Sequence, residues 1–337
     1  MTGALTFGYL YDFRNPEQWR RPWQELYAEV LDFIAWSEDA GFGGAWVPEH
    51  HMADDGYLPS PMIMLAAIAA RTSRMRIGSA IALAPLYHPL RFAEDAVVLD
   101  ILSGGRLEMA LAIGYRRREA EAYGLDFGKR GARFDEFLDV VRRLWAGETV
   151  TFEGRHYTLN EAKLMPPAPR GRVTLHIGGF AEKALARVAK HADGYFGNEE
   201  VCGLYIDKLR QEGKDPASAR ILLQDLFVTV AENPAAAMEE IGPYFHYVNN
   251  SYGAWLNEDK AIGLADTKLA PMSFDEFRTS GILRILTPGQ AIDRFRAQKA
   301  RMPALEHIML MLPPGLPPAS FRPYAELFAR EVIPAFR

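Results

Sequence analysis

Short apolar runs of β-strand character alternate with amphipathic helical segments along most of the chain. The first strand is expected at 5–9. It is followed at 22–40 by apolar residues at helical spacing, which stop at Gly41. The expected strands are 5–9, 44–48, 77–82, 107–113, 173–177, 194–196, 221–230 and 307–312, and the expected helices are 22–40, 61–72, 89–102, 133–145, 181–192, 205–211, 288–299 and 321–333.

This alternation predicts the α/β class. Because each of the eight expected strands is followed by a helix, we expect a closed (β/α)8 TIM barrel, formed by a single domain over residues 1–337. An open doubly wound sheet also alternates strands with helices. However, no G-x-G-x-x-G motif follows the first strand, so the sequence offers no support for a dinucleotide-binding sheet.

Two segments depart from the repeating unit. Residues 151–171 combine alternating polarity, turn residues and a proline cluster, and we expect a hairpin-like excursion and a connector there. Residues 232–286 form a long insertion late in the barrel. Two interpretations of it stay open, a lid over the barrel mouth or an extra packed helical subdomain. Its large side chains are Tyr244, Phe245, Tyr247, Tyr252, Trp255 and Met272.

Charge and cysteine content narrow the possible partners. The formal net charge is -5 and Lys and Arg are dispersed, so we expect a small-molecule substrate and neither nucleic acid nor an anionic membrane. No apolar run approaches the ~20 residues that span a bilayer, and the N-terminus lacks a signal-peptide pattern, which predicts a soluble cytoplasmic protein. The single cysteine, Cys202, excludes an intramolecular disulfide and a Cys-based metal site.

The stretch WVPEHHM, residues 46–52, ends the second expected strand with Glu49, His50 and His51. In a barrel, active sites lie at the C-terminal ends of the strands. Adjacent histidines rarely bind one metal ion together, and the other histidines are scattered, so no metal site is predicted. An acid/base site and a strand end whose polar groups satisfy one another both remain open.

Three further features could serve a ligand. Gly178 and Gly179 lie between an expected strand and helix, where backbone N–H groups favour an anion, although a tight turn is the plainer reading. Arg130 and Arg133 lie near a helix start, either as anion-binding groups or as a solvated basic loop. The strand RIGSAIALAP, residues 76–85, carries small side chains that would admit a flat ligand or simply pack closely.

These segments together resemble the bacterial luciferase-like family of flavin-dependent monooxygenases and oxidoreductases. The resemblance covers most of the chain from Leu5 to Tyr195, and it returns at residues 286–296 and in the C-terminal helix. The matching segments are VPEHH, IGSAIALAP, HPLRFAEDAVVLDILSGGRLEMALAIG, RGARFDEFLDVVRRLWAGETVTFEGRHY and LHIGGFAEKALARVAKHADGY, with LTPGQAIDRFR further on.

The resemblance implies a barrel that binds FMN, reduced FMN or a reduced deazaflavin coenzyme at its C-terminal mouth. His50 corresponds to a family histidine that acts as an acid/base near the reacting flavin. Ser79 and Ala80 correspond to residues lying against the isoalloxazine ring, and Ala80–Ile81 to a cis non-prolyl peptide bond. Arg133 corresponds to a phosphate-binding arginine.

Gly178, Gly179 and Phe180 correspond to a backbone phosphate cradle. The chain departs from the luciferases themselves at Ala112 and Ile113, where they carry a cysteine and an arginine. One reactive thiol and one phosphate contact are therefore absent, and we do not expect light emission.

The resemblance favours a two-component monooxygenase. A separate flavin reductase would supply reduced FMN, and molecular oxygen would be used to oxygenate an apolar or aromatic small molecule. The alternatives are a deazaflavin-dependent reductase or dehydrogenase and a non-catalytic flavin-binding protein. The resemblance also implies a homodimer, formed through helices near 61–72 and 89–102.

Overall fold

A computed structural model describes residues 4–258 and 270–337, and eight parallel strands close into a barrel. The (β/α)8 prediction is confirmed. In barrel order the strands are β1 (Thr6–Leu10), β2 (Gly44–Val47), β3 (Arg76–Leu83), β4 (Leu107–Ala112), β7 (Thr174–Gly178), β8 (Gly194–Gly197), β9 (Ile221–Gln224) and β12 (Leu305–Met311). The last strand closes the barrel by pairing with the first, Leu310 opposite Tyr9.

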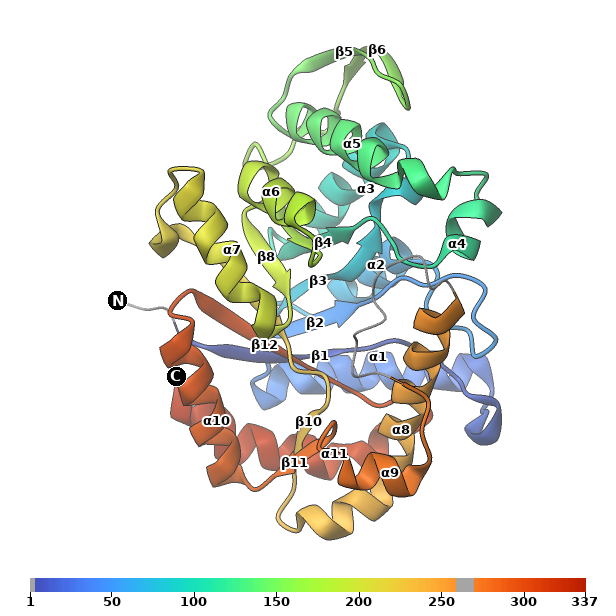
Figure 1. Cartoon of the computed structure of the whole chain (residues 1–337), viewed down its shortest axis with the longest axis vertical. Helices are drawn as coiled ribbons and strands as arrows, with labels where there is room; N and C mark the ends of the chain where they lie inside the picture. The colour runs from blue at the N-terminus through green and yellow to red at the C-terminus, as the bar shows by residue number, and fades with distance from the viewer. Residues whose placement is uncertain (1–3, 259–269) are drawn as a thin grey trace.

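The helices surround this barrel, as Figure 1 shows. They are α1 (Trp23–Ala40), α2 (Pro61–Arg71), α3 (Pro89–Leu102), α4 (Arg117–Ala122), α5 (Arg130–Trp145), α6 (Glu182–His191), α7 (Glu199–Gln211), α8 (Pro234–Glu258), α9 (Phe274–Thr279), α10 (Pro288–Arg301) and α11 (Pro318–Leu327). Among the described residues, no helix combines the length and apolar character needed to cross a membrane.

The expected strand 221–230 is wrong as a single element. The chain leaves the barrel at Asp225, whose carboxylate binds Arg294 (2.7 Å) and Gln298 (3.1 Å). The second half of the run becomes β10 (Val228–Val230), which pairs outside the barrel with β11 (Arg284–Leu286). Two helices also differ from expectation: α7 begins at Glu199, capped by the Asn198 side chain, and α4 was not expected at all.

The excursion near 151–171 is present as the antiparallel pair β5 (Thr149–Glu153) and β6 (Thr158–Lys163), seen at the top of Figure 1. The Glu136 carboxylate of α5 ties it down by accepting hydrogen bonds from the N–H groups of residues 155, 156 and 157. Residues 232–286 contain α8, α9 and β11, and 259–269 lie outside the described residues.

The barrel interior has an apolar layer and a polar layer. The apolar layer is built from Leu10, Trp46, Ala80, Ala110, Phe196, Leu222 and Met309. Toward the N-terminal ends of the strands, Trp46 Nε1 donates to His307 Nε2 (2.9 Å) and His176 contacts Glu108 (2.9 Å). Gly78 makes room for this packing, because a Cβ there would lie 2.0 Å from Glu108 O and 2.5 Å from the Trp46 ring.

Candidate active site at the barrel mouth

The loops that follow β1 and β2 are joined at the C-terminal end of the barrel. His50 N donates to Leu58 O (3.1 Å), and Leu58 N donates to Asp12 O (3.1 Å). Asn15 N donates to Asp55 O (2.7 Å). These backbone bonds hold His50 next to the first strand's loop, and its side chain is buried, with only 8% exposed.

The Glu119 carboxylate orients the His50 ring. Its Oε1 lies 2.9 Å from His50 Nδ1, 3.0 Å from the His51 N–H and 3.3 Å from Arg116 Nη1. Burial opposes ionisation of Glu119, but the bonds to His50 and His51 and the charge of Arg116 outweigh it and lower the pKa of the carboxyl. An ionised carboxylate accepts a hydrogen bond from the N–H of Nδ1, so in the neutral ring Nε2 is the nitrogen without a proton.

Glu49 and His51 serve the surrounding structure. Glu49 Oε2 accepts from the Leu83 N–H at 2.6 Å, and Oε1 accepts from Tyr87 Oη at 2.7 Å. The His51 ring lies between Glu49 (3.1 Å) and Tyr123 (3.1 Å). The Glu49 and His51 side chains are therefore fully engaged with the ends of β3 and α4, and they support the loop that carries His50.

Aromatic rings surround His50. Ring centres of Tyr57, Trp255 and Tyr115 lie 4.7, 5.2 and 5.5 Å from that of His50. Tyr252 is 6.2 Å away, and its hydroxyl is 2.6 Å from that of Tyr57. The rings come from the β2 loop, the β4 loop and α8, so the insertion contributes directly to the wall around His50.

The two small residues of β3 have different surroundings. The Ser79 hydroxyl donates to Ala110 O (2.8 Å) and accepts from Ala110 N (3.0 Å), bridging an irregularity in the β3–β4 pairing. The Ser79 hydroxyl is therefore hydrogen-bonded to the backbone of β4. Ala80 joins the apolar interior layer, and the Ala80–Ile81 peptide bond is cis, as the resemblance predicts.

The glycine pair stands where β7 ends. A Cβ on Gly178 would lie 2.4 Å from Ile81 Cδ1, so the Ile81 side chain of β3 occupies the space beside Gly178. Gly179 has φ of +142°, which a residue with a side chain rarely adopts. Phe180 is 53% exposed, just before α6 begins at Glu182.

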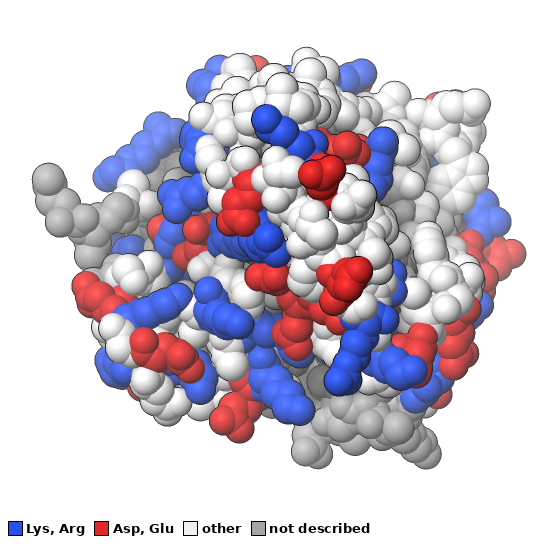
Figure 2. All heavy atoms as spheres, turned by 90° about the horizontal axis from the view of Figure 1, so that it is seen from above, with Lys and Arg blue, Asp and Glu red and all other residues white. Residues whose placement is uncertain are grey.

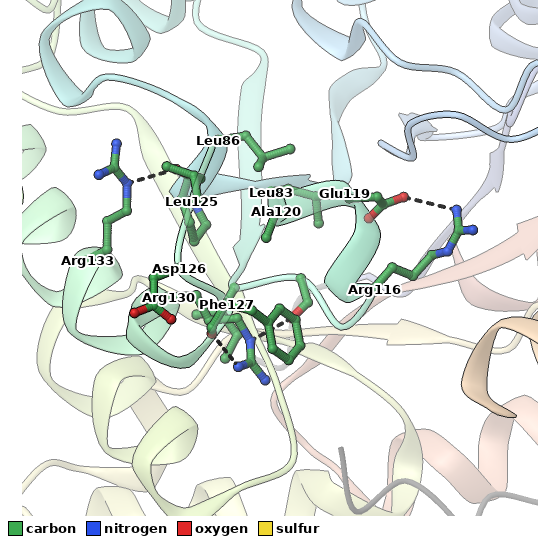
Figure 3. Close-up of a pocket in the computed structure, with 13 residues that line it drawn as sticks. Leu83, Leu86, Arg116, Glu119, Ala120, Leu125, Asp126, Phe127, Arg130 and Arg133 are labelled. Atoms are coloured by element: carbon green, nitrogen blue, oxygen red, sulfur yellow. Dashed lines mark hydrogen bonds and ion pairs between the residues drawn. The ribbon is translucent and has the colours of Figure 1, made fainter. Parts of the chain in front are cut away.

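Arg133 borders a small pocket between the ends of β3 and β4 and the start of α5. Its Nε donates to Pro85 O (3.0 Å) and its guanidinium stacks on Tyr157 at 4.4 Å. Figure 3 shows Arg133 on one side of this pocket and the Arg116–Glu119 pair on the other. Glu119 thus connects the pocket to His50, whereas Gly178, Gly179 and Phe180 are not among the residues that line it.

Several residues that meet at His50 were not predicted from the sequence. Glu119 and Arg116 come from the short α4 region, and Tyr57 from the irregular loop after β2. Arg14 and Asp55, which form a buried ion pair at 2.6 Å, belong to the same mouth.

On the face shown in Figure 2, Lys and Arg are interspersed with Asp and Glu. No group of three or more metal-ligating side chains occurs in residues 4–258 and 270–337.

Comparison with known proteins decides the family. A sequence profile of the luciferase-like monooxygenases matches residues 5–303. The chain belongs to the luciferase-like monooxygenase family. This confirms the resemblance, and the family is one of oxidoreductases. The oxygenase component of a flavin-dependent trigonelline monooxygenase from Acinetobacter baylyi is 25% identical over 335 residues, which are 93% of this chain and 91% of that protein.

The relatives also include a protein named for a different coenzyme, F420. An F420-dependent glucose-6-phosphate dehydrogenase from Microbacterium testaceum is 31% identical over 50% of this chain and 51% of that protein. The chain spans about half the length of this relative and of an uncharacterized protein from Sinorhizobium fredii. Among solved structures, a monooxygenase from Streptomyces bottropensis has a TM-score of 0.84 at 22% identity, covering 98% of this chain and 100% of that one, which shows a shared fold.

Proposed function

We propose that this member of the luciferase-like family is a flavin-dependent monooxygenase of the two-component type. It would use reduced FMN from a separate reductase, together with molecular oxygen, to oxygenate an apolar or aromatic small molecule. The observation that carries the proposal is the His50–Glu119 pair at 2.9 Å within a wall of aromatic rings at the barrel mouth. That arrangement would offer a positioned proton carrier beside apolar rings that keep water away from the reacting atoms.

The residues at the mouth fit a flavin. Ala80 and Ile81 would give the flat floor against which a ring system lies, and Gly178, which has no side chain, leaves room for Ile81 there. The Gly179 and Phe180 backbone would hold the phosphate before α6, together with Arg133, whose Nε donates to Pro85 O at 3.0 Å. Reduced FMN would supply the two electrons that activate oxygen.

The chain's own contribution would be proton control and exclusion of water. His50 Nε2 would accept a proton from the reacting groups or donate one to them, while Glu119 holds Nδ1 and keeps the ring in one tautomer. Tyr57, Tyr252 and Trp255 would keep water from the reacting atoms.

The insertion 232–286 would act as a lid. Its helix α8 already places Tyr252 and Trp255 against His50. Glu258, at the end of α8, binds Arg116 at 3.3 Å. These contacts favour the lid over a subdomain that only packs on the outside of the barrel.

A second candidate is a reductase or dehydrogenase that uses a reduced deazaflavin. It is favoured by the identity of 31% to an F420-dependent dehydrogenase over half of this chain. In that reaction a hydride would be transferred and no oxygen consumed. The His50–Glu119 pair would serve equally well as the proton carrier of that reaction.

An assay carried out both in air and under nitrogen tests the proposal. The protein would be supplied with reduced FMN from a separate flavin reductase, or with reduced F420, and offered a panel of aromatic and apolar compounds. We expect products heavier by one oxygen atom in air with reduced FMN and none under nitrogen. Turnover under nitrogen with reduced F420 would replace the proposal by the second candidate.

We further propose a homodimer formed through α2 and α3. Large apolar side chains are exposed along these helices and beside them: Ile63 (74%), Leu102 (60%), Val98 (46%), Ile101 (45%) and Met165 (68%). A surface of this kind usually marks an association site. Replacing Ile63 and Leu102 by Glu is expected to give monomers in sedimentation experiments.

A further inference from the structure

Arg14 has a charged group whose hydrogen-bonding capacity is largely unused. Its side chain is 1% exposed, and Nε donates to Asp55 Oδ2 at 2.6 Å. The two terminal nitrogens, Nη1 and Nη2, are buried and have no hydrogen-bond partner. Buried polar groups in folded proteins are almost always hydrogen-bonded, so a fork of unpaired donors at the barrel mouth points to a missing acceptor.

The neighbouring arginine shows that this is not a general feature of the mouth. Arg116 is equally buried and its Nε lacks a partner, but both nitrogens of its fork are bound: Nη1 donates to His51 O and Glu119, and Nη2 donates to Glu258. Arg14 is held differently. Tyr247 Oη donates to the same Asp55 oxygen at 2.7 Å, which fixes the carboxylate on Nε and leaves the fork facing away from it.

Aromatic rings enclose the Arg14 guanidinium. Its Cζ lies 4.9 Å from the centre of the Tyr57 ring, 5.0 Å from Tyr247 and 5.2 Å from Trp255. The Tyr57 ring is also 4.7 Å from the His50 ring, so His50 and Arg14 both pack against one side chain. Tyr247 and Trp255 belong to α8, so this helix forms part of the wall around the guanidinium.

The charge balance allows an anion. Asp12 is the second carboxyl near Arg14, and burial raises the pKa of this carboxyl to about 7, against the lowering influence of Arg14. Near neutral pH Asp12 is therefore partly protonated, and the guanidinium charge is met mainly by Asp55. A carboxylate matches the open fork of a guanidinium with two parallel hydrogen bonds.

We propose that Arg14 is a substrate-binding residue whose terminal nitrogens bind a carboxylate carried by a planar aromatic substrate, next to His50. Calling the ligand the substrate rests on the proposed function. A phosphate group offers the same oxyanion chemistry, but the mouth already has a separate candidate phosphate site at Arg133 and Gly178–Phe180. The aromatic walls around Arg14 favour the substrate as the source of the anion.

Binding of simple probes tests the proposal without turnover. Benzoate, its neutral analogue benzamide and inorganic phosphate would each be titrated into the wild-type protein by ligand-observed NMR. We expect benzoate to bind at least about tenfold more tightly than benzamide, the effect of one hydrogen bond to a charged group. Equal binding of benzoate and benzamide would overturn the proposal, as would binding of phosphate alone.

Two arginine-to-lysine variants test whether Arg14 is the residue that causes the preference for benzoate over benzamide. Arg14→Lys keeps the charge but removes the fork, so it is expected to abolish the preference for benzoate over benzamide. Arg21→Lys is the matched control: Arg21 also has nitrogens without partners but is partly exposed and pairs with Glu29. A benzoate preference that survives in Arg14→Lys would overturn the assignment, and circular dichroism would verify that both variants fold.

The result is separable from that of the proposed function. If benzoate bound through Arg14 but no compound of the panel were turned over in an oxygen-dependent reaction, the role of Arg14 in binding a carboxylate would stand and the proposed monooxygenase function would be rejected. Oxygenation of neutral compounds in a protein that does not bind benzoate would do the reverse.

Discussion

A single carboxylate explains why one of two adjacent histidines is suited to chemistry. Glu119 Oε1 binds the Nδ1 of His50 but only the backbone N–H of His51. The His51 ring is bound on both nitrogens, by Glu49 and Tyr123. Only His50 keeps a ring nitrogen free to exchange a proton at the mouth, so its orientation depends on Glu119.

Replacing Glu119 by Gln tests this dependence. The amide cannot supply the charge that fixes the His50 tautomer, so we expect kcat to fall about tenfold to a hundredfold, with little change in flavin binding. Steady-state kinetics with reduced FMN would measure kcat. The pH profile of kcat should shift, because Glu119 is hydrogen-bonded to His50, the proposed proton carrier. Glu121→Gln, on the exposed side of the same helix, is the control. If both variants behaved alike, Glu119 would have no positioning role.

At the scale of elements, α8 is the part of the insertion that reaches the site. Trp255 is its central contact, lying 5.2 Å from the His50 ring, 4.4 Å from the Arg116 guanidinium and 5.5 Å from Tyr252. Cation–π contacts with buried arginines hold an aromatic ring more firmly than apolar contact alone. The end of α8 is thus fixed over the mouth by side chains from the loops after β2 and β4.

Removing this ring should let water into the site. For Trp255→Ala we expect reduced FMN to be oxidised with severalfold more hydrogen peroxide per molecule of product, because a reaction exposed to water loses oxygen as peroxide. Peroxide and product would be quantified in the same assay. The neighbouring Asn257→Ala, on the exposed surface of α8, serves as control. Unchanged coupling of oxygen use to product in Trp255→Ala would argue against the lid.

At the scale of the whole molecule, one buried histidine joins the strands that close the barrel. His307 Nε2 accepts from Trp46 Nε1 (2.9 Å), and its Nδ1 lies 2.8 Å from Thr6 Oγ1, which itself donates to Glu306 O. These roles require a neutral ring with its proton on Nδ1. Burial, aided by the charge of Arg76, lowers the pKa of His307 well below its usual range.

The sign of the resulting pH effect follows from linkage. The folded pKa of His307 lies below the unfolded value of about 6.5, so its contribution is complete above that pH and is lost as the pH falls below it. Relative to His307→Gln, the wild type should lose up to ~1.4 kcal/mol of unfolding free energy per pH unit in that range.

Urea unfolding of both proteins at pH 7.5 and 5 would measure this difference. Asp12 contributes in the opposite direction, because its raised pKa makes folding bind a proton, but it is present in both proteins and cancels. A difference between the two proteins that does not change with pH would show that His307 is not held neutral.

The barrel could be predicted from sequence because each of its units is local. An apolar run, a turn and an amphipathic helix follow one another, and eight such units leave few ways to bury their apolar faces. The split of 221–230 into two strands could not be predicted. The run stays apolar on both sides of Asp225, and only contacts from α10, distant in sequence, make the chain turn there.

Only some residues of the candidate site could be predicted from the sequence. His50 could be singled out because two histidines at the end of a barrel strand are unusual, and Arg133 and the glycine pair followed from the resemblance. Glu119 lies 69 residues from His50 on a helix of 6 residues, too short to leave a periodic pattern. The Ser79 hydroxyl is engaged with β4, a bond that depends on the register of two strands.

The most direct test of the account is product formation by His50→Ala at saturating reduced FMN in air. Loss of a positioned proton carrier is expected to lower kcat about 10²- to 10⁴-fold while reduced FMN still binds. His88→Ala, at an exposed histidine, should retain wild-type activity. Product formation by His50→Ala at the wild-type rate would contradict the central claim that His50 handles the proton of the reaction.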